Sequence, residues 1–168
     1  MEFKKAEFQD AAAIMKIIKA AQRYLKNKGI DQWQKNYPNL ETIKNDIENS
    51  YSYLLKKDKI IIATAAIIFG EDPTYNYIEA GDWICEGKYG VIHRAAVAED
   101  YKGQGIISKI FKESFKLAKA EAADSIRIDT HPKNFPMQRA IEKEDFKYCL
   151  RVPFIDSFNA RSSVVSSE

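Results

Sequence analysis

The hydrophobic positions of the chain follow two spacings, one of three to four residues and one of two residues, and so predict helices mixed with strands. The first helical stretch starts after Asp10, which stands at the N-cap position. Its apolar face carries Ile14, Ile17, Ile18, Ala21 and Leu25. A second, shorter helix follows Asn39, also as an N-cap, with Leu40, Ile43 and Ile47 on one face. A short strand at residues 2–6 precedes both helices.

The rest of the chain reads as strands and two further helices. Runs rich in β-branched and aromatic residues predict strands, at residues 51–55, 60–69, 89–97, 125–130 and 146–152. The segment KKDK predicts the turn between the first two of these strands. Helices are expected after residue 105 and from Asn134, again as an N-cap, to about Lys143. We expect one domain over residues 1–156. We also expect a weakly patterned, Ser-rich tail over residues 157–168 that is a frayed end or a poor edge strand.

Composition and charge exclude several classes of protein. The 168 residues include 26 basic and 24 acidic ones spread along the chain, for a formal net charge of +2, which argues against a nucleic-acid binder or a polybasic membrane binder. The two cysteines form no CxxC or Cys/His cluster, so we expect neither disulfides nor a metal site. No apolar run is long enough to span a bilayer and no signal peptide is seen. We therefore expect a cytoplasmic protein.

A turn with two glycines joins a predicted strand to a predicted helix. The strand, the turn with Gly103 and Gly105, and the helix start together offer unpaired backbone N–H groups, a helix dipole and close backbone approach. An anion fits such a place, although the two glycines also suit a tight turn with no ligand. A P-loop would need GxxxxGK[ST], which is absent, and a Rossmann fingerprint would need glycine where Ser108 stands.

The residues around this turn carry a family resemblance. The segment VIHRAAVAEDYKGQGIISKIF, followed by IRIDTHPKN and then EDF, resembles the GNAT family of acetyl-CoA-dependent N-acetyltransferases. The resemblance extends over the element order from Glu2 to about Val152. It implies an α/β (α+β) fold with a mixed, mostly antiparallel central sheet and helices on both faces. The segments IDQWQKNYPN and EDPTY resemble a bacterial subgroup whose members are mostly of unassigned substrate.

The resemblance also implies which residues hold acetyl-CoA. The family's turn, Q/R-x-x-G-x-G/A, falls on residues 102–107 and would bind the pyrophosphate. Its six residues are Lys102, Gly103, Gln104, Gly105, Ile106 and Ile107. Lys102 replaces Gln or Arg but keeps a cation, and Ile107 replaces a small residue. Ala95, Ala96 and Val97 would pair with the pantetheine arm as a neighbouring strand would. Asn134 would hydrogen-bond the pantetheine or adenosine side of the cofactor.

The chemistry needs a group that takes a proton from the acceptor amine. A lysine-like amine has a pKa near ~10.4, whereas an imidazole changes charge close to neutral pH. His93 and His131 are therefore the candidates for base or proton relay. Each has a structural alternative, which for His131 is to pin its loop with Asp129 as partner.

The thiolate of coenzyme A needs a proton donor when it leaves. At the position of that donor the chain differs from the family. Many members place a tyrosine seven residues after the residue that corresponds to Asn134, where this chain has Ile141. Tyr148 or solvent would then protonate the thiolate, or the protein binds acetyl-CoA without fast turnover. Asp145 stands where a glycine commonly ends the helix.

Three residues are candidates for contact with the acceptor. Trp33 and Tyr37 would form part of its wall, or pack under a long loop. Arg94 would bind an acceptor carboxylate, or form a surface salt bridge. We expect transfer of an acetyl group from acetyl-CoA to a primary amine of a small molecule or peptide. A coenzyme A-binding module with regulatory or degenerate function is the alternative, and an adaptor that binds ATP or NAD is a weaker one. A homodimer is left open.

Overall fold

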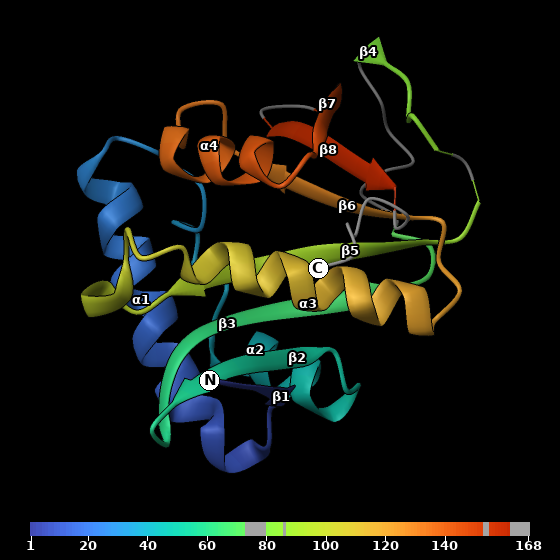
Figure 1. Cartoon of the computed structure of the whole chain (residues 1–168). Helices are drawn as coiled ribbons and strands as arrows, with labels where there is room; N and C mark the ends of the chain where they lie inside the picture. The colour runs from blue at the N-terminus through green and yellow to red at the C-terminus, as the bar shows by residue number, and fades with distance from the viewer. Residues whose placement is uncertain (73–79, 86, 153–154, 162–168) are drawn as a thin grey trace. The chain divides into compact units, whose positions relative to one another are not determined.

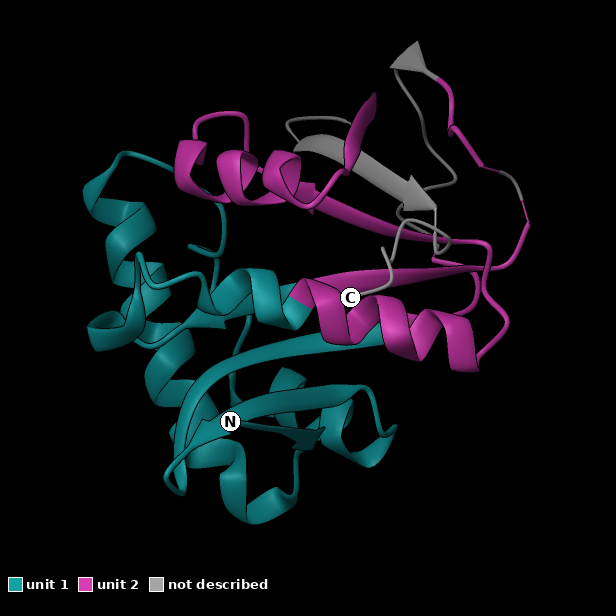
Figure 2. Ribbon diagram, in the orientation of Figure 1, with its two compact units in different colours: residues 1–67, 94–110 teal, residues 68–93, 111–168 magenta. Residues whose placement is uncertain are grey.

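The computed structural model describes residues 1–72, 80–85, 87–152 and 155–161 (Figure 1). The predicted fold class is confirmed, since helices alternate with strands that are mostly antiparallel. The chain forms two units, one of Met1–Ile67 with Arg94–Ile110 and one of Ile68–His93 with Phe111–Glu168 (Figure 2). The single domain over residues 1–156 stays a prediction, and each unit is described by itself.

The strands of the first unit form an antiparallel series. β1 (Glu2–Lys5) pairs with β2 (Ser52–Lys57), and β2 pairs with β3 (Ile60–Phe69). The β2–β3 hairpin turns on only two residues, Asp58 and Lys59, whose φ angles of 50° and 68° are those that a tight hairpin turn requires. The four-residue turn KKDK was thus predicted two residues too long. On the other side of β3, the Ala98 N–H donates to the Ile62 carbonyl at 2.8 Å.

Two helices bury an apolar face in this unit, as their spacing predicts. α1 (Ala11–Asn27) and α2 (Leu40–Glu48) share one hydrophobic cluster with residues of β2 and of β5 (Tyr89–Val97). The cluster consists of Ala6, Ala11, Ile14, Met15, Ile17, Ile18, Ile43, Ile47, Leu54 and Ala96. The Asn39 side chain accepts the Thr42 N–H at 2.9 Å, so the predicted N-cap of α2 is confirmed. No helix in the described part of the chain is long and apolar enough to cross a membrane.

Asp10 stands at the predicted N-cap of α1 but does not cap it. Its carboxylate accepts the Glu7 N–H at 3.0 Å and forms an ion pair with Lys56 Nζ at 3.3 Å. The reason is that residues 8–10 form a 3₁₀ turn ahead of α1, which turns the carboxylate back towards residue 7. Asp10 therefore ties the start of the helix to β2.

The second unit combines one parallel strand pair with antiparallel ones. β5 runs parallel to β6 (Ser125–Thr130), with residues 89–92 opposite residues 125–128. β6 then pairs with β8 (Ile155–Arg161), β8 with β7 (Lys147–Val152), and β7 with β4 (Ala80–Gly81). The prediction of a frayed end or edge strand from residue 157 is wrong for residues 157–161. These residues lie in β8, whose backbone pairs on both sides, while residues 162–168 lie outside the described part.

Aromatic contacts and one stacked arginine organise the core of this unit. α3 (Ile106–Ala120), which starts in the first unit, contributes Phe111 and Phe115, whose ring centroids lie 5.5 and 5.3 Å from that of Phe146. Arg127 of β6 is buried, and its guanidinium lies 3.9 Å from the Trp83 ring centroid and 3.6 Å from that of Tyr89. The two ring faces stabilise this buried cation. α4 (Phe135–Lys143) buries Ile141 completely.

Gly90 of β5 is a site where any side chain would overpack this core. A Cβ there would lie 2.5 Å from Phe69 Cε1 and 2.9 Å from Ile126 Cδ1. We expect Gly90→Ala to lower the free energy of unfolding by about 1–3 kcal/mol, as overpacking of a filled core does. Urea denaturation measures this, and Phe69→Leu in the Gly90→Ala background should recover part of the loss. A Gly90→Ala protein as stable as wild type would contradict this close packing.

Candidate functional site

The turn between β5 and α3 has the conformation that its glycines predict. Gly103 and Gly105 have φ angles of 73° and 69°, the left-handed region that residues other than glycine adopt at a cost. A Cβ added at either glycine would meet no atom within 4 Å, so the space over the turn is open. In the described part of the structure, the backbone N–H groups of Gly103, Gln104 and Gly105 donate to no acceptor.

These groups fit a phosphate. The unpaired N–H groups of the turn are followed by the first N–H groups of α3, which have no partner within the helix. Consecutive backbone amides at a helix N-terminus bind anions, and the helix dipole adds to the attraction. The side chains of Ile106 and Ile107 are buried and half-buried, so at these positions only the backbone is available to an anion. Gln104 Nε2 donates to the Asp100 carbonyl at 2.9 Å, which holds the turn itself.

Lys102 is exposed and rests on an aromatic ring that the sequence analysis missed. Its Nζ lies 4.6 Å from the ring centroid of Tyr24 in α1. A cation over a tyrosine face is attracted by about 0.5–1 kcal/mol at an exposed site. This is enough to favour one position of a flexible side chain, so Tyr24 holds the Lys102 ammonium beside the glycine turn. Tyr24 is 78 positions from Lys102, and no local pattern signals the pair.

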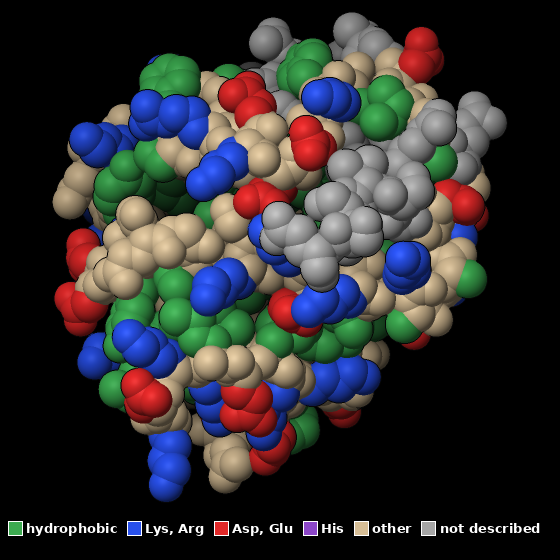
Figure 3. Space-filling view, viewed as in Figure 1, with side chains coloured by type: hydrophobic (Ala, Val, Ile, Leu, Met, Phe, Trp, Pro, Cys, Tyr) green, Lys and Arg blue, Asp and Glu red, His purple; other side chains and the backbone are tan. Residues whose placement is uncertain are grey.

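The positive charge available to an anion is local. On the face shown in Figure 3, lysine and arginine side chains are interspersed with acidic ones. This agrees with the near balance of 26 basic and 24 acidic residues in the sequence. A mixed surface of this kind attracts anions weakly over long range. Specific binding of an anion therefore depends on groups such as the turn amides and Lys102.

β5 changes its backbone conformation at Arg94. The φ angle of Arg94 is 53°, which costs an L-residue about 1–2 kcal/mol. The parallel ladder with β6 ends just before it, at Ile92 and Ile128, whereas β5 continues to Val97. Residues 95–97 thus lie beyond this ladder, and their pairing with the pantetheine arm stays a prediction. Because of the φ angle of Arg94, the alternation of side chains between the two faces of a strand is interrupted at this residue.

The Arg94 side chain forms a buried ion pair. Its Nε and Nη2 donate to the two carboxylate oxygens of Asp46 in α2, both at 2.7 Å, and its Nη1 donates to the Tyr37 hydroxyl at 2.7 Å. The side chains of Arg94 and Asp46 are only 9% and 5% exposed. Burial by itself would lower the pKa of the Arg94 guanidinium, but the Asp46 carboxylate and the Tyr37 hydroxyl outweigh burial and raise that pKa.

This ion pair bears on both predictions made for Arg94, contact with an acceptor carboxylate and a surface salt bridge. The structure gives Arg94 a carboxylate partner of its own, and the salt bridge is buried and not on the surface. Contact of Arg94 with an acceptor stays a prediction. The sequence analysis also missed Asp46, although a carboxylate beside Ile47 and three residues after Ile43 could have marked it. A charge on the edge of an apolar helix face is rarely buried without a partner.

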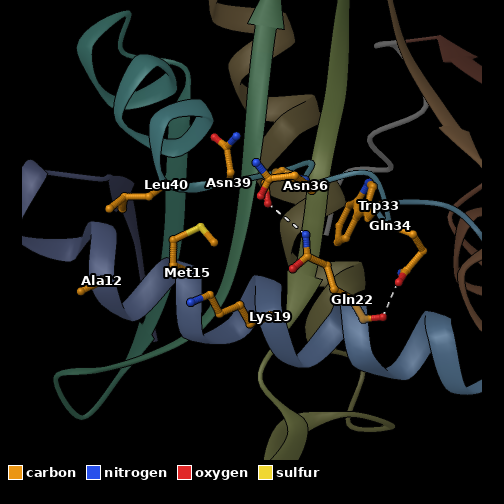
Figure 4. A pocket seen from close by; sticks show the side chains of 10 residues that line it. Ala12, Met15, Lys19, Gln22, Trp33, Gln34, Asn36, Asn39 and Leu40 are labelled. Atoms are coloured by element: carbon orange, nitrogen blue, oxygen red, sulfur yellow. Dashed lines mark hydrogen bonds between the residues drawn. The ribbon is translucent and has the colours of Figure 1, made fainter.

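Trp33 and Tyr37 belong to a loop that walls a groove. Trp33 packs against the cluster that contains Met15 and Ala96, and Tyr37 reaches Arg94. The groove lies between this loop and α1 and has a volume of about 600 Å³ (Figure 4). It is lined by Ala12, Met15, Lys19, Gln22, Trp33, Gln34, Asn36, Pro38, Asn39 and Leu40. Trp33 therefore packs under the loop and also lines the groove, and its contact with an acceptor stays a prediction.

In the second unit, His93 lies between two carboxylates. Its Nε2 is 2.5 Å from Asp72 Oδ2, and its Nδ1 is 3.8 Å from Asp129 Oδ1. The three side chains are 17%, 12% and 19% exposed. The sequence analysis missed Asp72 and considered Asp129 only as a partner of His131. A ring with a carboxylate at each nitrogen is held in one orientation, and some access to solvent remains.

The other candidates of the second unit hold structural positions. His131 Nδ1 accepts the Lys133 N–H at 3.1 Å, which pins its loop. Asn134 precedes α4, but its side chain does not cap the helix as predicted. Its φ and ψ of −86° and 63° are not the extended conformation of a capping residue. Tyr148 is 54% exposed, while Ile141 is fully buried and so offers no group to a reaction. Asp145 has a φ of 60°, the conformation that favours glycine there.

The turn, the interrupted strand and the order of elements are also those of a known family. The family model of the acetyltransferase (GNAT) family matches residues 14–146. This chain belongs to the GNAT family. No curated protein matches the chain significantly. Acetyl-CoA is the cofactor of GNAT acetyltransferases, and the turn residues fit its phosphates.

Solved structures of acetyltransferases resemble the chain over nearly its full length. A GNAT acetyltransferase from Streptococcus agalactiae is 28% identical, with a TM-score of 0.85 and coverage of 95% of this chain and 94% of that one. A putative acetyltransferase from Staphylococcus aureus is 24% identical, with a TM-score of 0.74 and coverage of 96% and 99%. The PaiA N-acetyltransferase from Thermoplasma acidophilum, solved with coenzyme A, is 14% identical, with a TM-score of 0.74 and coverage of 95% and 98%.

The buried ion pair predicts a large effect of removing one partner. We expect Asp46→Ala to lower the free energy of unfolding by about 3–5 kcal/mol, because the Arg94 charge would stay buried without its carboxylate. Urea denaturation at neutral pH measures this. The double variant Asp46→Leu with Arg94→Met should be more stable than Asp46→Ala, since no charge is then left unpaired. A double variant no more stable than Asp46→Ala would contradict the assignment of the loss to an unpaired charge.

Proposed function

We propose that the protein transfers the acetyl group of acetyl-CoA to a primary amine of a small molecule or peptide. Bound acetyl-CoA supplies an acetyl group activated as a thioester. The observation that carries the proposal is the open turn whose backbone N–H groups at residues 103–105 have no acceptor in the described part of the structure. Membership of the GNAT family supports acyl transfer. The cytoplasmic location and a homodimer stay predictions.

In this proposal residues of the first unit bind the phosphates and the pantetheine amides of the cofactor. The amides of Gly103, Gln104 and Gly105 and of the first turn of α3 bind the two phosphates. Lys102, held over Tyr24, adds a positive charge beside them. Ala95 and Val97 offer backbone groups to the pantetheine amides, as one strand does to another. Asn134, whose side chain makes no hydrogen bond in the described part of the structure, binds the pantetheine or adenosine side.

In this proposal residues of the second unit take the proton from the acceptor amine. His93 Nε2 donates its hydrogen to Asp72, which leaves Nδ1 as the nitrogen that takes a proton from the acceptor amine, directly or through a water. Asp129, 3.8 Å from Nδ1, stabilises the imidazolium that results. This is the arrangement in which a carboxylate fixes the tautomer and the orientation of a histidine base. His131 and Tyr148 stay as alternative groups for the base and for the return of a proton.

The glycine turn is tested by a variant that fills it. We expect Gly105→Glu to weaken acetyl-CoA binding at least tenfold, because its side chain brings bulk and a negative charge to the phosphate position. Gly29→Glu is the matched control, since Gly29 has a φ of 68° and open space around it but lies at the end of α1. Isothermal calorimetry compares both with wild type. Equal binding by Gly105→Glu and Gly29→Glu would show that the turn does not hold the phosphates.

The proton transfer is tested by variants that keep the shape of the site. We expect His93→Gln to lower kcat/KM for amine acetylation about 100-fold or more, the usual contribution of a general base. Asp72→Asn should also lower it strongly, since an amide at this position no longer fixes the tautomer of the ring. Release of free thiol with a panel of amines measures turnover, and calorimetry should show unchanged acetyl-CoA affinity. Activity of His93→Gln equal to that of wild type would exclude His93 as the base.

The same assay separates enzyme from binding module. The burial of Ile141 at the position where many family members have a tyrosine favours the alternative of a coenzyme A-binding module without fast turnover. Such a module would bind acetyl-CoA in calorimetry but release no thiol with any amine. A protein that binds no acetyl-CoA at all would contradict both readings.

A further inference from the structure

The groove beside α1 is a preformed cavity of the size that small molecules occupy. One wall is a single face of the helix, because Ala12, Met15, Lys19 and Gln22 follow one another at intervals of three and four residues. The opposite wall is the loop that leads to α2, with Trp33 and Gln34 at one end and Leu40 at the other (Figure 4). A volume of about 600 Å³ lies within the range of ligand pockets.

Hydrogen bonds hold the loop at a fixed position against the helix. Gln22 Nε2 donates to the carbonyls of Tyr37 and Pro38 at 3.1 and 3.0 Å. Gln34 Nε2 donates back to the Gln22 carbonyl at 3.1 Å. These bonds run between the two walls, so the groove exists before a ligand enters. A preformed site loses little conformational entropy on binding.

The groove also shares its floor with the strand that carries the cofactor residues. Met15 and Trp33 pack in the same hydrophobic cluster as Ala96 of β5. At the other end of the loop, the Tyr37 hydroxyl accepts a hydrogen bond from Arg94, the residue just before Ala95. The wall of the groove and the backbone at residues 95–97 are therefore parts of one packed assembly within the first unit.

The charge among the ten residues that line the groove is positive. Lys19 is the one charged side chain among the ten lining residues, and none of the ten is acidic. In the described part of the structure, its ammonium has neither a hydrogen bond nor an ion-pair partner. An ammonium ion in this groove would meet no carboxylate of the lining, whereas an anion would meet Lys19. Amide side chains of the lining, such as that of Asn36, can donate hydrogen bonds to an anion in the groove.

We propose that this groove binds the carboxylate end of the acceptor, so that the substrates are amines that also carry a carboxylate, such as amino acids or short peptides. Lys19 forms the ion pair, and Met15, Trp33 and Leu40 contact the apolar part of the molecule. One lysine balances one carboxylate, and the lining has no second cation for a phosphate dianion. This inference rests on the proposed acetyl transfer, because it assigns the substrate of that reaction.

Matched sets of compounds test the carboxylate directly. Alanine, methionine and phenylalanine are each compared with their carboxamides, with the amines that lack the carboxyl group, and with their aminophosphonate analogues. We expect thiol release from acetyl-CoA to show kcat/KM at least tenfold higher for an amino acid than for its carboxamide. Lys19→Gln should remove this preference through KM, with kcat little changed. Lys16→Gln, an exposed lysine of α1 outside the groove, is the control and should keep the preference.

A binding measurement tests the groove independently of the proposed acetyl transfer. The N-acetylated amino acids and their N-acetyl carboxamides are titrated into the protein saturated with coenzyme A, by calorimetry and without turnover. Binding of the carboxylates that is at least tenfold weaker in Lys19→Gln than in Lys16→Gln supports the groove, even if no amine is acetylated. The inference is overturned by equal binding of both compound classes, by no binding of any carboxylate, or by a higher kcat/KM for the aminophosphonates than for the amino acids in the thiol-release assay. Acetylation of amines without a carboxylate preference would leave the proposed function standing and this inference refuted.

Discussion

The buried ion pair between Arg94 and Asp46 is the constraint on which the candidate site depends. It fastens β5 to α2 at a residue whose backbone, with a φ of 53°, is not that of a regular strand. An arginine left alone at this depth would cost several kcal/mol, so the pair and the backbone conformation stabilise each other. The hydrogen bond from Arg94 to Tyr37 extends the constraint to the loop of the groove. One guanidinium thus determines where the strand leaves its ladder and where the groove wall lies.

The first unit offers positive charge to ligands in two chemically different ways. The turn at residues 102–105 uses backbone amides, with Lys102 held over Tyr24 as an added charge. Such a site binds a phosphate regardless of which side chains surround it, so it tolerates the exchange of Gln or Arg for Lys102. The groove depends instead on one side chain, Lys19, among neutral walls. If the groove binds the acceptor as proposed, a single substitution at Lys19 would change the choice of acceptor and leave the glycine turn as it is.

Local sequence patterns predicted much of the fold. They did not predict contacts between residues that are far apart in the sequence. β3, β5 and β6 have the predicted bounds, and β3 in particular is a long run rich in β-branched residues. Arg94 with Asp46 and His93 with Asp72 are separated by 48 and 21 positions, and no spacing rule brings them together. β8 was missed because its side chains alternate weakly, yet hydrogen bonds to strands on both sides specify it. The caps at Asp10 and Asn134 failed because the neighbouring turns use other geometries.

The loss of the family's tyrosine at Ile141 does not by itself prevent turnover. Ile141 is fully buried in α4, so a hydroxyl there would need a partner inside the core, and an apolar side chain avoids that cost. What is lost is a proton donor for a thiolate, and a simple thiol titrates near ~8.5, which makes its anion a weak base. Removal of a proton from the acceptor amine, which titrates near ~10.4, is needed near neutral pH whether or not a side chain protonates the thiolate. In the proposed function the two carboxylates beside His93 would assist that removal.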